Sequence, residues 1–128
     1  MEWAKIIDQL DWNNNETIIN DAKNKLLTIP EEYIHLLMQP SSKWHWENAA
    51  DVVVHLNVNS CFPEMLKWLQ DLNWPGAKKI FNMLSIYEGS DIDKHITDAL
   101  ILVKLENDEV WYENIDQLIK IRKIKFTV

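Results

Sequence analysis

Glycine is scarce in this chain: only two of its 128 residues are glycine. Tight β-hairpin turns and phosphate-cradling loops rely on glycine for positive φ angles, so β-rich and nucleotide-loop architectures are disfavoured. A single cysteine, Cys61, excludes an intramolecular disulfide and has no second cysteine for a metal motif. No neighbouring charge clearly activates it, so we expect a partly buried, inert thiol.

Long apolar runs are also missing. None approaches the roughly 18 residues that a membrane-spanning helix needs. The first residues, Met1-Glu-Trp-Ala-Lys, have neither the basic segment nor the long apolar segment of a signal peptide. The hydrophobic content of 47% is that of an ordinary globular protein. We therefore expect one domain, residues 1–128, with no membrane association and a cytoplasmic location.

Recognisable catalytic motifs are absent as well. The sequence has no nucleophile elbow, no Walker loop and no dinucleotide fingerprint, which favours a non-enzymatic role without a cofactor. The Glu32-x-x-His35 spacing resembles that of di-metal bundles, but such sites need a second copy, and the sequence has none. We predict no metal site, and two further Asp/His pairs at i, i+4 spacing are interpreted as ordinary helix pairs (Asp51 with His55, Asp91 with His95).

Positive charge is scarce outside the last residues. The net charge is −7, and setting aside the basic run at 120–125 leaves −11 for the chain up to Ile119. Nucleic acid is therefore a poor partner, because phosphate contacts need clustered Lys and Arg. We expect the basic run to be solvated and to pair with acidic neighbours on the same molecule; it comprises Lys120, Arg122, Lys123 and Lys125.

Tryptophan, by contrast, is plentiful and regularly placed. Helix-like stretches open at Trp12, Trp46 and Trp74, and a less exact copy opens at Trp111. The starts lie 34, 28 and 37 residues apart, which is the length of a helix-turn-helix repeat. The intervening segments keep a similar step, because Pro30-Glu-Glu and Pro63-Glu-Met are 33 residues apart. The spacing predicts stacked antiparallel helix pairs.

The apolar periodicity predicts about eight helices with short loops, an all-α fold. Asn14 or Asn15 is expected to cap the second helix, and Asn73 or Trp74 the one that contains Ala77 to Leu84. We expect Gly89 to end that helix in the left-handed conformation. The helices are predicted over 2–11, 15–27, 30–38, 46–56, 63–72, 74–88, 91–106 and 109–123.

A resemblance supports this architecture. Trp68-Leu-Gln-Asp-Leu-Asn-Trp-Pro-Gly-Ala77, with the upstream Trp46-Glu-Asn-Ala-Ala50, resembles a small bacterial family of uncharacterised HEAT-like helical-repeat proteins. The similarity covers roughly residues 28–125. It implies a short right-handed α-solenoid of stacked antiparallel helix pairs, and it implies no activity.

Two aromatic segments are candidate binding residues. Trp44 and Trp46 flank His45, and alternate positions on a helix point about 200° apart, so both indoles cannot face one core. One is then packed along the preceding loop or exposed as a contact anchor beside His45 and Glu47. In the second segment, Trp74 can either cross a helix corner or join a recognition surface with the polar residues before it (Asp71 and Asn73).

These observations favour a protein-binding domain that uses one face of the helical stack. A sharper variant is an immunity-type protein that neutralises a basic toxin, since the body is acidic. An enzyme or small-ligand binder with a pocket between repeats is the alternative from another class. Homodimerisation through an end of the stack is also open, because both ends keep apolar residues (Trp3, Ile6 and Ile7; Ile121, Ile124 and Phe126).

Overall fold

The computed structural model describes residues 2–56 and 59–124, and within these ranges the chain is all-helical, without a strand. The α-helices in this part of the chain are α1 (Glu2–Asp8), α2 (Glu16–Leu26), α3 (Trp46–Val53), α4 (Phe62–Trp68), α5 (Ala77–Ile86), α6 (Asp91–Glu106) and α7 (Glu109–Arg122). Short 3-10 helices lie between them: η1 (Glu31–Leu37), η2 (Lys43–His45) and η3 (Asn59–Cys61).

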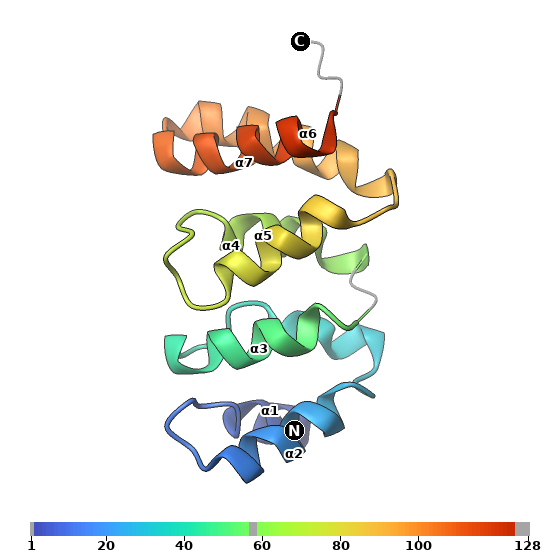
Figure 1. Cartoon of the computed structure of the whole chain (residues 1–128), viewed down its shortest axis with the longest axis vertical. Helices are drawn as coiled ribbons and strands as arrows, with labels where there is room; N and C mark the ends of the chain where they lie inside the picture. The colour runs from blue at the N-terminus through green and yellow to red at the C-terminus, as the bar shows by residue number, and fades with distance from the viewer. Residues whose placement is uncertain (1, 57–58, 125–128) are drawn as a thin grey trace.

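The helices pack as successive pairs. α1 packs on α2, η1 on α3, α4 on α5, and α6 on α7. The second members of the pairs, α2, α3, α5 and α7, contact one another in chain order. Figure 1 shows the pairs piled along the long axis, with the starts of α2, α3 and α5 on the same edge. Segments from successive pairs are therefore brought together along that edge.

Local capping chemistry explains several helix boundaries. The side chain of Asn15 accepts a hydrogen bond from the backbone N–H of Thr17 at 2.7 Å and so caps α2, as predicted. Asn107, with φ 56°, ends α6, and Asp108 caps α7 by accepting from the N–H of Trp111 at 3.0 Å. The predicted boundaries at Asp91 and Glu109 are confirmed.

The segment predicted as a helix over 30–38 is a 3-10 helix, η1. Ile34 and Leu37 are both buried, and their spacing of three places them on one side of a 3-10 helix. The same spacing also fits an α-helix, so the sequence pattern could not separate the two forms. Residues Pro30 and Pro40 bracket the segment and keep it short.

The predicted stop at Gly89 is wrong. α5 ends earlier, at Ile86, and Gly89 does not have a positive φ. Arg122 instead satisfies carbonyls at and just beyond the end of α5: its guanidinium donates to the carbonyl oxygens of Leu84, Tyr87 and Gly89 at 2.8, 2.6 and 2.9 Å. The side chain of Arg122 is 7% exposed and pairs with Asp93, so this part of the basic run is buried structure rather than a solvated tail.

One hydrophobic core extends through the pairs, from Ile7 in α1 to Ile119 in α7. Trp68 and Trp111 are buried in it. The indole N–H of Trp68 donates to the carbonyl of Pro75, and that of Trp111 donates to the carbonyl of Leu66, both at 3.0 Å. Within the described ranges no helix has both the length and the apolar character needed to cross a bilayer. Phe126 and Lys125, which entered the predictions for the C-terminal end, lie outside the described residues.

Candidate functional site

Two tryptophans from successive loops form an exposed pair. Trp12 precedes α2 and is 44% exposed, and Trp44 lies in η2 and is 51% exposed. Their ring centroids are 5.2 Å apart in an edge-to-face arrangement, with 71° between the planes. The backbone N–H of Trp12 donates to the carbonyl of Trp44 at 3.1 Å, so the loops as well as the rings are joined. The pair is therefore held in place before any partner arrives.

A second aromatic group adjoins this pair. Trp46, the first residue of α3, is half-buried and donates its indole N–H to the carbonyl of Pro40 at 2.6 Å. Its ring meets Trp74 edge-to-face at 5.5 Å. The ammonium of Lys43 lies 5.7 Å from the ring centre of Trp46 and 5.5 Å from that of Trp74, within cation–π range of both.

His45, predicted as a candidate contact residue, is buried beneath this exposed surface. It is 8% exposed, with Nδ1 3.2 Å from the carbonyl oxygen of Ser42 and Nε2 3.1 Å from that of Asp8. The imidazole thus ties the η2 loop to the end of α1. These two carbonyls hold the imidazole inward, while the adjacent Trp44 stays exposed.

The turn before α5 is fixed by glycine rather than by the predicted caps Asn73 or Trp74. Gly76 is the N-cap of α5 and has φ +82°. Its N–H donates to Oε1 of Glu47 at 2.9 Å, which ties the turn to α3. A Cβ at this position would lie 2.7 Å from the Cβ of Ala50 and 2.8 Å from the carbonyl of Trp46. Only glycine therefore allows both the backbone conformation and the close approach.

Asp71 and Asn73 play smaller parts in this turn. Oδ1 of Asp71 accepts from the backbone N–H of Asn73 at 2.8 Å, the local bond expected for an Asp that shapes a turn. This agrees with the structural interpretation of Asp71 as a group that satisfies a free N–H. Asn73 is exposed.

Charged side chains connect three helices beside the turn. Lys79 in α5 contacts Glu47 at 2.6 Å and also Asp51, both in α3, and Lys23 in α2 contacts Asp51 at 2.9 Å. Burial opposes ionisation of Asp51, but the hydrogen bonds from Lys79 and Lys23 outweigh it and hold its pKa below the ordinary value. Burial likewise disfavours the charged form of Lys79, yet the two carboxylates raise its pKa. The charges of the network are therefore paired with one another.

Together these elements enclose a groove of about 480 Å³. We call it the tryptophan groove; its lining residues are Trp12, Glu47, Leu72, Asn73, Trp74, Pro75, Gly76, Lys78 and Lys79. Of the predicted site residues, Glu47, Asn73 and Trp74 line it, while Trp44 and Trp46 adjoin it through ring contacts. His45 and Asp71 do not line the groove; His45 ties the η2 loop to α1, and Asp71 shapes the turn before α5.

Sequence reasoning missed Trp12, Lys43 and Lys78 as site residues. The sequence marks Trp12 as the opening of a repeat, but its place beside Trp44 results from packing between pairs and has no local signal. The regular recurrence of tryptophan at or near the start of each second helix is the available clue, because the starts of α2, α3 and α5 lie on the same edge.

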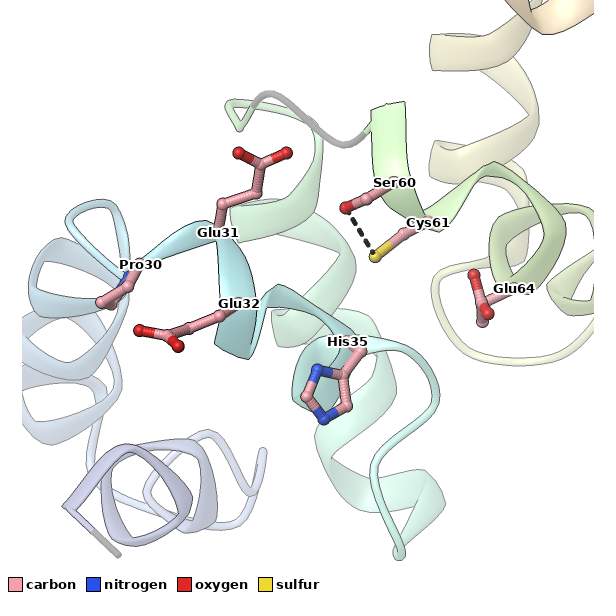
Figure 2. A pocket seen from close by; sticks show the side chains of 7 residues that line it. All are labelled: Pro30, Glu31, Glu32, His35, Ser60, Cys61 and Glu64. Atoms are coloured by element: carbon pink, nitrogen blue, oxygen red, sulfur yellow. Dashed lines mark hydrogen bonds between the residues drawn. The ribbon is translucent and has the colours of Figure 1, made fainter.

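A second hollow, of about 670 Å³, lies between η1 and α4. Figure 2 shows the carboxylates of Glu31 and Glu32 pointing in different directions, with His35 on the same wall and Glu64 on the opposite one. The thiol of Cys61 is buried next to Ser60, and burial raises its pKa, so it is a poor nucleophile. The described residues hold no group of three or more His, Cys, Asp or Glu placed to bind a metal.

Comparison with known proteins gives one family match. A model described as "Domain of unknown function (DUF5071)" matches residues 49–126, from within α3 past the end of α7. No curated protein and no solved structure matches the chain. The matched range includes Trp74, Lys78 and Lys79 and stops short of Trp12 and Trp44.

Proposed function

The chain belongs to the DUF5071 family, whose description assigns no function, and from its own surface we propose that it is a non-enzymatic protein-binding domain with the tryptophan groove as its binding site. The architecture that we infer is a short right-handed α-solenoid of HEAT type. The packing of α2, α3, α5 and α7 in chain order supports this inference, and the right-handed sense comes from the resemblance alone.

The exposed pair of Trp12 and Trp44 is the observation that carries the proposal. Isolated exposed hydrophobic residues are ordinary, but two large aromatic rings held together by a backbone hydrogen bond are costly to leave in water. Tryptophan is enriched among the residues that dominate binding energy, and preorganised side chains lose little entropy when a partner binds. The pair therefore has the properties of an interface anchor.

The test is capture of partners from a native lysate with the tagged chain and with the double variant Trp12→Ala/Trp44→Ala. We expect the variant to lose at least about tenfold of the specifically captured protein, because one interface anchor contributes roughly 2 kcal/mol or more. Ile86→Ala is the matched control, since Ile86 is 77% exposed at the opposite end of α5 from the groove. Equal capture by the folded double variant and the wild type would refute the proposal.

The second hollow supports a different candidate, an immunity-type protein that neutralises a basic toxin. Glu31, Glu32 and Glu64 line it, and opposite charge accelerates association. Charge reversal of Glu31 and Glu32 to Lys separates the two candidates. It would slow binding of a basic partner strongly at low salt and leave binding at the tryptophan groove unchanged.

A further inference from the structure

We propose that the tryptophan groove takes an extended, proline-containing segment of its partner that also carries acidic residues. This inference rests on the proposed function above and names the chemistry of the partner. It follows from three features of the groove: the unused indole donors, the arrangement of the rings and the sign of the unpaired charges.

The tryptophans divide into two groups by what their indole N–H groups do. In the first group the N–H is consumed internally by a backbone carbonyl; it comprises Trp46, Trp68 and Trp111. In the second group the N–H makes no hydrogen bond within the described part of the chain. This group comprises Trp12, Trp44 and Trp74 at the groove, and Trp3 in α1, which neither lines the groove nor contacts its rings. The N–H of Trp74 reaches solvent, because in that same part no buried side-chain nitrogen or oxygen lacks a partner. The groove thus offers donors that a bound segment can use.

A polyproline II segment matches such donors. It makes no internal hydrogen bonds, so its carbonyl oxygens remain free to accept from indole N–H groups. Its proline rings are compact and apolar and pack against aromatic faces. The planes of Trp12 and Trp44 are 71° apart, and those of Trp46 and Trp74 are 76° apart. Each pair therefore presents the face of one ring next to the edge of the other, and a proline ring fits into the angle between them. The segment is also ordered before binding, which lowers the entropic cost.

Among the residues that line the groove, the one charged side chain without an ion pair in the described residues is that of Lys78, although the whole chain carries −7. Lys43 adds a second positive charge beside the groove, over the rings of Trp46 and Trp74. The carboxylate of Glu47 is occupied by the N–H of Gly76 and by Lys79. Lys43 and Lys78 are exposed, and neither makes an ion pair within the described residues. Charge complementarity therefore selects acidic residues beside the prolines and disfavours a basic segment.

The test uses the indole N–H signals of the full chain in a ¹H–¹⁵N spectrum, assigned with single Trp→Phe variants. The probe is a synthetic peptide of about twelve residues, roughly four turns, made of Pro-Asp-Pro-Pro repeats. Two matched peptides replace every Asp with Lys or every Pro with Ala. We expect the signals of Trp12, Trp44 and Trp74 to shift with the first peptide, and those of Trp68 and Trp111 to stay unchanged.

The expected preference is at least about tenfold for the Asp peptide over the Lys peptide, and Lys78→Glu should remove most of it. Equal binding of the Lys peptide would overturn the acidic part of the inference. Equal binding of the Ala peptide would overturn the proline part. Tighter binding of a single-stranded oligothymidylate at physiological salt, with the same signals moving, would overturn the choice of a protein segment.

The peptide titration and the lysate capture together distinguish a wrong partner chemistry from a wrong proposed function. If none of the peptides binds but Trp12→Ala/Trp44→Ala still loses a captured lysate protein, the partner chemistry is wrong and the groove remains a protein-binding site. If none binds and capture is also unaffected by the double variant, both proposals are wrong.

Discussion

Asn48 and Asn114 make the same bond in two different places of the stack. The side-chain amide of Asn48 in α3 donates to the carbonyl of Leu10, just after α1, at 2.7 Å. The amide of Asn114 in α7 donates to the carbonyl of Leu69, just after α4, also at 2.7 Å. Both asparagines are 9% exposed. Each one therefore satisfies a carbonyl at the end of the first helix of the preceding pair, where helices leave acceptors without partners.

Replacing either asparagine by leucine should destabilise the protein by about 1–3 kcal/mol, because a buried carbonyl is left without a donor. Denaturant unfolding of Asn48→Leu and Asn114→Leu measures the loss. Asn20→Leu is the control, since Asn20 is exposed on α2. A loss no larger than that of the control would show that water replaces the amide at no cost.

Gly76→Ala should destabilise the protein by roughly 2–4 kcal/mol, since the left-handed φ and the contact with Ala50 both resist a Cβ. Gly76→Asn should lose less stability than Gly76→Ala, because asparagine tolerates a positive φ. It should still be less stable than the wild type, because its Cβ makes the same close contacts. Thermal unfolding of the three proteins checks this order. Stability of Gly76→Ala equal to that of the wild type would mean that the turn can relax.

Arg122→Ala should cost about 3 kcal/mol or more, because it removes a buried cation from Asp93 and frees the carbonyls at the end of α5. Lys120→Ala is the matched control from the same basic run. Its side chain is 77% exposed and pairs with Asp116 at i, i+4 spacing, which is worth about 0.5 kcal/mol or less. Similar unfolding midpoints for the two variants would contradict a stabilising role for the contacts of Arg122 with Asp93 and the carbonyls.

Acid should weaken the charge network at Asp51. Because the folded-state pKa of Asp51 is lowered, its contribution is fully present above its unfolded pKa of about 4 and is lost as the pH falls through the folded value. Asp51→Asn should therefore be less stable than the wild type at pH 7 by about 0.5–1 kcal/mol, a figure discounted for solvent exposure. The difference should shrink near pH 3, as measured by urea unfolding. A constant difference across this range would exclude Asp51 as the titrating group.

Sequence alone predicted several helix boundaries that depend on local chemistry, although not those of α5. Asp91 at the start of α6, Asn107 at its end and Asn15 before α2 act on backbone groups a few residues away, so their effect can be read from composition and order. The all-helical fold followed from the same signals. The match to a family of unknown function agrees with the predicted membership in an uncharacterised family.

Features that depend on contacts between pairs could not be predicted. Trp12 and Trp44 are 32 positions apart and meet only after α1 and η1 have packed together. Arg122 belongs to a run that resembles a solvated tail, and its burial is decided by the free carbonyls of α5. His45 is held inward by the carbonyl of Asp8, 37 positions away in α1, a contact that has no local signal in the sequence.

The pair formed by α1 and α2 has a packing neighbour on one side only within the described chain, through η1 and α3. Regions with few tertiary contacts open first in local unfolding, so amide hydrogen exchange should be faster in this pair than in the two inner pairs. Trp12 is carried by the loop of that pair, whereas Trp44 belongs to the next one. A ligand that contacts both rings therefore holds the α1–α2 pair against the next pair and opposes its local unfolding. Occupancy of the groove and exchange protection of α1 and α2 should then rise together, although the ligand contacts neither helix.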